Sequence, residues 1–550
     1  MNKIDFSSQR ILIVDDQRPF LSLLKGVLGT VGAKSIVTSR TCEAALGVCR
    51  REKFDLIVCD LHIGSHRKNG FEFLEELREF DLLKPDGVFV LISADAQRPV
   101  VLGSIEKQPD EYVVKPFSQG QLLVRLEKAL IRKKALAPVY KYINTKNFPA
   151  AIEVCQQIIA VNSRYKQLAG RILIELYWQT GQYAEAQQWL TNYRDEHRPI
   201  WLYLSKAHTE LLLQNYQQAI ALANAALQKN SLLVEAYDIM AESWFKLHNQ
   251  QEAENAINQA LRLSPYSLQR QLKACTYARQ RQDYEKVIVH SQQMWECSKR
   301  SIHRNISYLS GHVRSYLDVA ELVNDSKTKG RFQQEAIYAL QRHRHNEYIS
   351  RDEEQFDLDI FEDIIQARIE SQNGKLFESK KYMVKAQTAI EEKFNDFPIP
   401  LAPDSIAVLL DLGEFEEAYQ LSQLLQQRQL AQDEHAAALL RSANRKHKSQ
   451  QEQYNRNNKL GISLYAEGKF AAAYEAFEQA KNAAPVNIGI NLNLLQCSLR
   501  LIEQSKKPDP ALLKSTRKTY LILKNMSMLK KHQEKFKALK TELEQYLDIQ

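Results

Sequence analysis

A recurrence of about 34 residues is the feature of this chain that most restricts its fold. Five dipeptides follow one another at steps of 35, 33, 34 and 34 residues; they are Asn147-Phe148, Gln182-Tyr183, Asn215-Tyr216, Asn249-Gln250 and Asp283-Tyr284. Three residues after each dipeptide stands a small or β-branched residue, in order Ala151, Ala186, Ala219, Ala253 and Val287. Small side chains let paired helices approach closely, so this segment is expected to be an all-α solenoid of stacked helix–turn–helix units.

The pattern resembles the tetratricopeptide repeat over roughly residues 137–300. A later match is centred on Gly468-Lys469-Phe470, and a weaker one begins at Gly413-Glu414-Phe415. Between residues 300 and 398 the period is lost while apolar residues keep helical spacing, and we predict turns at Gly330-Arg331-Phe332 and Asn373-Gly374-Lys375. We expect a break in the solenoid around residues 396–403, where three prolines cluster. The resemblance implies a scaffold that binds another, unidentified protein.

The first part of the chain has a different pattern, in which short apolar runs end in charged residues. The runs are Ile11–Asp16, Leu56–Asp60 and Tyr112–Phe117. This is typical of buried parallel strands, and the carboxyl ends of such strands meet at one edge of an open α/β sheet. The charged residues expected to converge there are Asp15, Asp16, Asp60 and Lys115. Carboxylates packed together repel one another unless a hard cation lies between them, so we predict a Mg²⁺ or Mn²⁺ site.

These residues resemble the receiver domain of two-component response regulators over the first ~130 residues. The resemblance implies a flavodoxin-like, doubly wound fold that accepts a phosphoryl group on Asp60. It implies that Asp16 and Asp60 bind the metal directly, that Asp15 acts through water, and that the backbone carbonyl of His62 completes the protein ligands. By the same resemblance Ser93 and Lys115 bind the phosphoryl group, Tyr112 is the aromatic switch residue, and the Lys115-Pro116 peptide is cis.

The loop after Asp60 departs from the family pattern. Position 64 is glycine where the family carries proline, and the next glycine, Gly70, comes 10 residues after Asp60 instead of eight. The loop at residues 64–69 is therefore expected to be two residues longer and more basic than usual. It either alters phosphoryl lifetime or kinase docking, or is a tolerated surface insertion.

Composition restricts the remaining function classes. The apolar and charged shares, 44% and 25%, are ordinary for a soluble protein of 550 residues, and the net charge of +8 does not by itself indicate nucleic-acid binding. No signal peptide or apolar run long enough for a membrane helix is visible, so a cytoplasmic location is expected. The seven scattered cysteines are expected to be reduced and mostly buried. No motif of a catalytic output domain is found, which predicts that the protein is not an enzyme beyond self-phosphorylation and autodephosphorylation at Asp60.

The C-terminal segment alternates apolar residues at spacings of three and four from Leu529 to Tyr546, with lysines on its other side. Three interpretations stay open: a helix that caps the last repeat, a coiled-coil seam that would make a homodimer, and a contact with an acidic partner or RNA.

We predict five parts: a receiver domain at 1–133, a tetratricopeptide-repeat array at 134–300, degenerate helical repeats at 301–398, tetratricopeptide repeats at 399–490, and C-terminal helices at 491–550. The expected function is that of a response regulator phosphorylated by a sensor histidine kinase or phosphotransfer protein, which signals through the repeats. The alternatives are a phosphate sink that inhibits phosphotransfer to a sister regulator, and a nucleic-acid regulator using the basic C-terminal helix.

Overall fold

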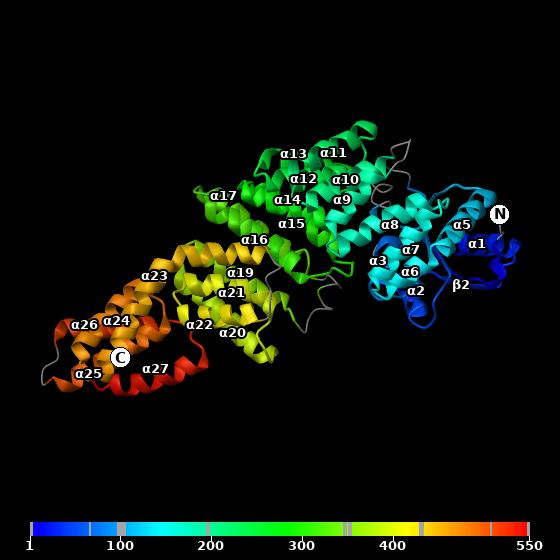
Figure 1. Ribbon diagram of the computed structural model, residues 1–550. Coiled ribbons are helices and arrows are strands. Elements are labelled where there is room, and N and C mark those ends of the chain that lie inside the picture. Colours follow the sequence, from blue (N-terminus) through cyan, green and yellow to red (C-terminus); the bar gives the residue numbers. More distant parts are fainter. Residues whose placement is uncertain are drawn as a thin grey trace. The chain divides into compact units, whose positions relative to one another are not determined.

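The chain folds into two compact units, Met1–Asn305 and Ile306–Gln550, which we describe separately. The computed structural model describes residues 4–64, 68–95, 106–193, 199–344, 349, 355–427, 434–505 and 509–546 (Figure 1). No helix in these ranges is long and apolar enough to cross a membrane. The cysteines in these ranges are free, and all but Cys297 are buried, as expected.

The N-terminal unit begins with a parallel sheet. Its strands are β1 (Arg10–Val14), β2 (Ser35–Ser39), β3 (Leu56–Asp60), β4 (Val88–Ser93) and β5 (Glu111–Val114). Their order is β2-β1-β3-β4-β5 and every neighbouring pair is parallel. This is the flavodoxin-like order, so the predicted doubly wound fold is confirmed.

Helices cover both faces of the sheet because alternate strand residues point to opposite sides. One core joins α1 (Arg18–Thr30) and α5 (Gln119–Ala135) to strand residues such as Ile13. The other joins α2 (Cys42–Cys49) and α3 (Gly70–Glu79) to their alternates, such as Leu12. With both faces covered, only the edges formed by the strand ends are left for chemistry.

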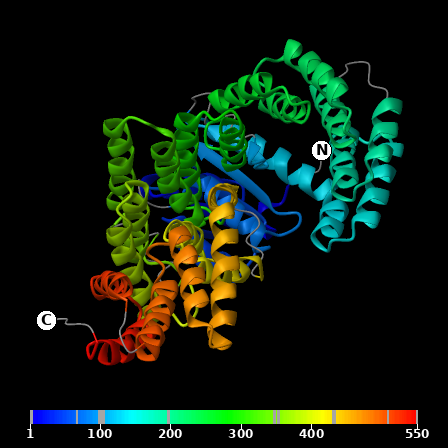
Figure 2. The ribbon, with the colours of Figure 1, turned by 90° about the vertical axis from the view of Figure 1, so that its left-hand side faces the viewer.

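A first helical array follows α5 with one residue between. Its helices are α6 (Ala137–Asn144), α7 (Phe148–Ala160), α8 (Lys166–Gln179), α9 (Tyr183–Asn192), α10 (Ile200–Leu212), α11 (Tyr216–Lys229), α12 (Val234–Lys246), α13 (Gln250–Leu263), α14 (Leu268–Gln280) and α15 (Tyr284–Ser298). Figure 2 shows the helices from α7 to α14 following one another along a curved row. Helices that are neighbours in the sequence pack together, so the predicted helical solenoid is confirmed.

The recurring dipeptides mark the start of every second helix of this array. In each, the first residue is the N-cap and the second begins the helix. The residue just before each dipeptide has a positive φ; these residues are Lys146, Gly181, Gln214, His248 and Gln282. The small residues that recur after the dipeptides are completely buried. The period therefore reports a repeated tight turn followed by a close helix–helix contact.

The C-terminal unit is also helical. It contains α16 (Ile306–Leu322), α17 (Ser326–Gln341), α19 (Leu358–Gln372), α20 (Leu376–Lys393), η2 (Ile399–Leu401), α21 (Ala402–Asp411), α22 (Phe415–Gln427), α23 (Glu434–Ala466), α24 (Phe470–Ala483), α25 (Ile488–Gln504), α26 (Pro510–Lys524) and α27 (Lys530–Leu543). Turns at Gly374, Gly413 and Gly468 repeat the left-handed geometry of the first array, with φ of 75°, 71° and 76°.

The sequence prediction is correct at one of the two proposed turns in the region without a period, and wrong at the other. The turn at Asn373-Gly374-Lys375 separates α19 from α20. Gly330-Arg331-Phe332 is not a turn, because all three residues lie inside α17. An isolated glycine costs a helix only about 1 kcal/mol, and the buried ring of Phe332 anchors the helix to its neighbours. The 33-residue helix α23 was also not predicted.

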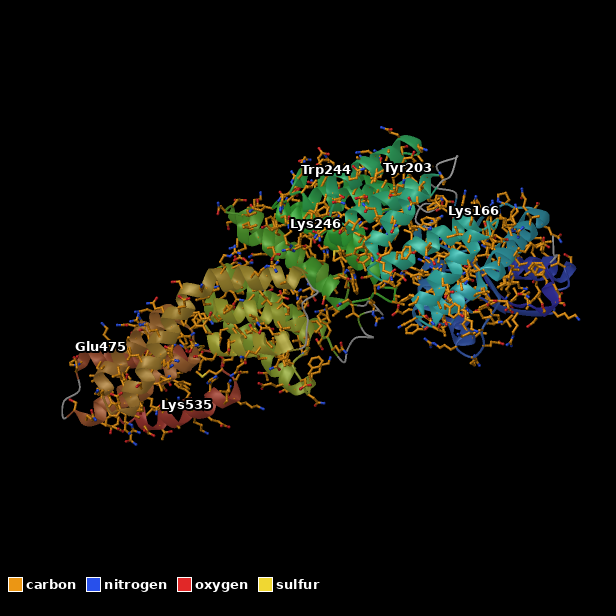
Figure 3. The ribbon with its side chains drawn as sticks, viewed as in Figure 1. Lys166, Tyr203, Trp244, Lys246, Glu475 and Lys535 are labelled. Carbon is orange, nitrogen blue, oxygen red and sulfur yellow. The ribbon has the colours of Figure 1, made fainter. Side chains whose placement is uncertain are left out.

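The C-terminal helix α27 packs on the unit as a cap. Its apolar residues Leu539 and Leu543 are buried in the core cluster of the unit, so they are not available as a coiled-coil seam. On its basic side Lys531 lies 3.4 Å from Glu417, and Lys535 (labelled in Figure 3) donates a hydrogen bond of 3.3 Å to Asn493. Of the three interpretations left open, these contacts favour the capping helix.

A buried ionic cluster joins three helices of the C-terminal unit. Asp404 of α21 is completely buried, and its Oδ2 lies 2.6 Å from Nε of Arg314, itself 1% exposed. Its other oxygen lies 3.5 Å from Arg368, which also binds Asp318 at 2.9 Å. Arg314 further donates to the carbonyl of Pro400. One carboxylate thus neutralises parts of two buried guanidinium groups from α16 and α19.

A second cluster predicts a pH dependence. Asp411 accepts hydrogen bonds from His447 (2.7 Å), Lys446 (3.1 Å) and Ser371 (2.6 Å). Burial opposes ionisation of Asp411, but the hydrogen bond from His447 and the charge of Lys446 outweigh it and lower its pKa to about 2. Burial likewise opposes the charge on His447, but the hydrogen bond to Asp411 raises its pKa.

We expect the stabilisation from this pair to be greatest between about pH 4 and 6.5. It is lost as the pH falls toward 2, because Asp411 is protonated, and lost as the pH rises through the raised pKa of His447. Chemical denaturation followed by circular dichroism should show that Asp411→Asn costs about 2 kcal/mol inside this window and less on both sides. A cost that does not vary with pH would contradict the prediction.

Candidate functional site

Two carboxylates and one lysine meet at the carboxyl edge of the sheet. Asp15 follows β1, Asp60 ends β3 and Lys115 follows β5. The Lys115 ammonium donates hydrogen bonds to Oδ2 of Asp60 and, at 3.2 Å, to Oδ2 of Asp15. Both carboxylates are buried, with exposed fractions of 8% and 1%. This confirms the expected convergence for three of the four charged residues.

The pair of carboxylates is electrostatically strained. Burial first, and the neighbouring charge of Asp60 second, raise the pKa of Asp15 to about 6. The backbone N–H of Gln17, which donates to Asp15 at 2.8 Å, and the charge of Lys115 act in the opposite direction. Burial is thus the main cause that disfavours the ionised form of Asp15, and a cation at this edge would favour that form.

The other predicted metal ligands lie beside this pair without completing a cluster. Asp16 is partly exposed, and Arg40 donates to its backbone carbonyl at 3.2 Å. The backbone N–H of His62 donates to Oδ1 of Asp60 at 2.9 Å, while the His62 side chain is exposed. No group of three acidic, histidine or cysteine side chains in the described ranges is arranged to hold a metal. The all-oxygen donors still fit Mg²⁺, which keeps several waters and takes few protein carboxylates.

The predicted switch residues occupy the neighbouring strand ends. Ser93 is completely buried at the end of β4, and its Oγ accepts a hydrogen bond of 3.0 Å from the backbone N–H of Asp95. The Tyr112 hydroxyl donates to the carbonyl of the same Asp95 at 3.0 Å. The Lys115-Pro116 peptide is cis, as predicted. Both switch side chains therefore contact one short segment that follows β4.

The start of α3 packs directly against the segment that carries the phosphoacceptor. Asn69 caps the helix, accepting from the N–H groups of Phe71 and Glu72. A Cβ added to Gly70 would lie 2.6 Å from Cδ2 of Leu91 and 2.8 Å from the carbonyl oxygen of Asp60. Within the unusual loop at 64–69, residues 65–67 lie outside the described residues. Position 70 therefore has no room for a larger side chain, although it lies two residues after the position at which the family pattern has its glycine.

An aromatic residue beside the lysine was not identified from the sequence. The Lys115 ammonium lies 3.9 Å from the ring centroid of Phe20, whose ring meets Phe117 edge-on at 6.1 Å. This cation–π contact helps to hold the ammonium between the carboxylates. Phe20 belongs to α1, and its spacing from the charged residues carries no recognisable motif.

A second missed group links the α/β domain to the first array. Arg270 of α14 is buried and forms ion pairs with Asp238 of α12 (2.8 Å) and with Glu106 (3.0 Å), which follows β4 in the chain. Ser264 Oγ donates to the same Glu106 carboxylate at 2.7 Å. Hydrogen bonds to both carboxylates outweigh burial and raise the pKa of Arg270. Residues 96–105, which precede Glu106, lie outside the described residues.

The two parts of this unit are also joined by a very short connection. Leu136 is both the C-cap of α5 and the N-cap of α6, and it is completely buried. Lys133 pairs with Asp110 at 3.3 Å and lies 4.1 Å from the ring centroid of Tyr140. Asn144 donates to Asp81 at 3.3 Å. The connection between α5 and α6 is therefore a single buried residue, and contacts on both sides support it.

Known proteins are similar to the first quarter of this chain. The chain is 33% identical over 131 residues to the alkaline phosphatase synthesis transcriptional regulatory protein PhoP of Bacillus subtilis (strain 168), and the match covers 24% of this chain and 52% of that protein. It is 31% identical over 122 residues to the transcriptional regulatory protein YvrH of the same organism, covering 22% and 49%. The chain thus spans about half the length of these curated relatives.

Among solved structures, the chain is similar to the BeF3-activated receiver domain of DrrB, a protein of Thermotoga maritima. The two are 27% identical, with 22% of this chain and 97% of that one covered and a TM-score of 0.20. Residues 11–127 match the response regulator receiver domain family. Together with the sheet order and the Asp15, Asp60 and Lys115 group, this match shows that the N-terminal α/β domain is a response regulator receiver domain.

Proposed function

We propose that the protein is a cytoplasmic response regulator that accepts a phosphoryl group on Asp60 and passes the signal to a partner protein through tetratricopeptide-like repeats. The convergence of Asp15, Asp60 and Lys115 carries the first half of this proposal. The helix pairs of the first array, with buried small residues at a spacing of about 34 residues, support the second half. No group in the described ranges suggests a further catalytic activity.

The phosphoryl donor in this proposal is a phosphohistidine on a sensor kinase or phosphotransfer protein. A carboxylate oxygen of Asp60 attacks phosphorus, the bond from phosphorus to the donor's imidazole nitrogen breaks, and the imidazole takes a proton from solvent. In this proposal Lys115, which already donates to Asp60, pairs with the transferred group, and Ser93 donates a hydrogen bond to it. Asp15, Asp16, Asp60 and the His62 carbonyl would hold Mg²⁺ or Mn²⁺, which when bound neutralises charge on the phosphoryl oxygens.

The contact between Glu106 and Arg270 supplies a route from the phosphorylation site to the repeats. Ser93 and Tyr112 both contact Asp95, and the chain runs from Asp95 to Glu106 before it reaches β5. Movement of Ser93 toward a phosphoryl group would break its hydrogen bond with Asp95, and Glu106 is held by Arg270 of α14. A charge event at Asp60 is thereby converted into a packing change in the array.

Replacing Asp60 by asparagine is expected to abolish phosphorylation by small phosphodonors such as acetyl phosphate, because the nucleophilic carboxylate is lost. Phosphate-affinity electrophoresis in the presence of Mg²⁺ measures it directly. Asp55→Asn is a suitable control, because this carboxylate binds the N–H of Arg10 at the opposite end of the strands. Phosphorylation of Asp60→Asn at the rate of the unaltered protein would contradict the proposal.

Removing the charge of Glu106 is expected to stop the helices of the first array from responding to the state of the receiver domain. In the unaltered protein, beryllofluoride with Mg²⁺ should change hydrogen exchange in α13 and α14. In Glu106→Gln that response should be lost, while beryllofluoride still protects β3 and the start of α3. Glu285→Gln, at an exposed position of α15, is the matched control. An unchanged response of α14 in Glu106→Gln would show that this ion pair does not transmit the signal.

A further inference from the structure

The C-terminal unit carries a surface groove that the receiver mechanism does not use. It is lined by Phe377 at the start of α20 and by a row of side chains on α26. The α26 residues are Lys514, Arg517, Lys518, Leu521, Ile522 and Asn525. The groove has a volume of about 470 Å³ and a largely apolar lining. Figure 1 labels both helices.

Two large apolar side chains are left exposed in this groove. Phe377 is 49% exposed and Leu521 is 42% exposed. Both helices are anchored by other residues, since Tyr520 and Leu523 of α26 and Met383 of α20 are buried in the core. The exposed pair is therefore not required to hold the helices in place. An apolar patch rimmed by charged residues is a common mark of a protein-binding surface.

The charged residues that line this groove all have one sign. Lys514, Arg517 and Lys518 are exposed, and no carboxylate in the described ranges lies within ion-pairing distance of any of them. Lys481 of α24, half-buried nearby, adds to the positive field, and its pKa is lowered by burial. Elsewhere on the unit, surface lysines such as Lys385 and Lys393 have carboxylate partners. The groove therefore presents positive charge that is not neutralised within the described chain.

We propose that this groove binds an acidic amphipathic helix of a partner protein. The lining residues of α26 recur at spacings of three and four over about 16 Å, which matches the apolar stripe of a helix of three turns laid alongside. Leu and Phe residues of the partner would contact Phe377 and Leu521. Glu and Asp residues flanking that stripe would pair with Lys514, Arg517 and Lys518. The inference names the partner class for the proposed output, but binding itself does not depend on Asp60.

Fluorescence anisotropy with a designed probe tests this proposal on the full-length protein. The probe is a fluorescein-labelled peptide of about 18 residues with Leu and Phe on one helical face and Glu on its flanks. We expect saturable binding that weakens at least about tenfold in Phe377→Ala and in the double variant Arg517→Glu with Lys518→Glu. The double variant Lys530→Glu with Lys537→Glu carries the same charge change at exposed positions of α27 and should bind normally.

The remaining outcomes separate this proposal from its competitors. A peptide of the same composition with a scrambled order should bind at least about tenfold more weakly, because it lacks the apolar stripe. Equal binding of the scrambled peptide, equal loss in the α27 variant, or tighter binding of a single-stranded RNA would overturn the proposal. Asp60→Asn should bind the probe normally, so failure of phosphorylation and failure of this groove are distinguishable. Circular dichroism confirms that each variant is folded.

Discussion

Replacing Asp404 by alanine is expected to lower the free energy of unfolding of the C-terminal unit by about 3–5 kcal/mol. Among the charged residues described above, this is the largest effect that we expect from one substitution. Removal of this carboxylate leaves Arg314, 1% exposed, without its ion-pair partner at 2.6 Å and weakens the field that holds Arg368. Neither guanidinium can reach water without separating α16, α19 and α21, because both are buried.

The two units provide an internal control for this experiment. All five tryptophans of the chain lie in the N-terminal unit, so tryptophan fluorescence reports on that unit, whereas circular dichroism reports on helices of both. In Asp404→Ala part of the circular dichroism transition should move to lower denaturant while the fluorescence transition stays in place. Glu335→Ala removes a carboxylate from an exposed ion pair with Arg342 and should change stability by less than about 0.5 kcal/mol. A loss of similar size in both variants would contradict the prediction.

Replacing Gly70 by alanine is expected to impair phosphorylation and stability together. The new Cβ would lie 2.8 Å from the carbonyl oxygen of Asp60 and 3.2 Å from Cα of Leu61, so relief requires movement of backbone. That movement shifts the phosphoacceptor relative to Lys115. We expect the free energy of unfolding to fall by about 1–3 kcal/mol, as it does at other overpacked sites. We also expect phosphorylation from acetyl phosphate to be at least about tenfold slower.

Gly120→Ala is the matched control, because a Cβ at that position in α5 meets no atom within 4 Å. Phosphate-affinity electrophoresis gives the phosphorylation rate, and hydrogen exchange in β3 and α3 gives the local stability. Normal phosphorylation of Gly70→Ala would show that the start of α3 can move without displacing Asp60.

The sequence predicts the parts of this structure that a recognisable pattern in the chain determines, namely the buried strands and the repeated turns. Asp15, Asp60 and Lys115 could be placed together because parallel strands bring their carboxyl ends to one edge. The turns before Phe148, Tyr183 and Tyr216 could be placed because each precedes a buried alanine at fixed spacing. In the first case the constraint acts on strand ends that buried apolar runs identify, and in the second on turns whose separation in the chain is regular.

The contacts that escaped prediction join residues with no regular separation. Arg270 and Glu106 are 164 residues apart, and Arg314 and Asp404 are 90 apart. A single charged residue in a helical pattern is usually solvated, so its sequence context does not distinguish a buried ion pair from a surface one. The turn predicted at Gly330 is wrong for a different reason. Glycine indicates a turn only where the surrounding packing does not favour a helix, and Gly330 lies inside α17.

The left-handed turns of the two arrays differ in a way that affects which substitutions the protein can accept during evolution. In the first array Lys146, Gln214, His248 and Gln282 adopt this conformation, at a cost of about 1 kcal/mol each, while the C-terminal unit uses glycine at the equivalent turns. These four side chains are exposed and lie far apart, so exchange for glycine would add up nearly independently. Exchange of these residues for glycine would therefore raise the stability of the first array, and that gain would offset destabilising substitutions elsewhere in it.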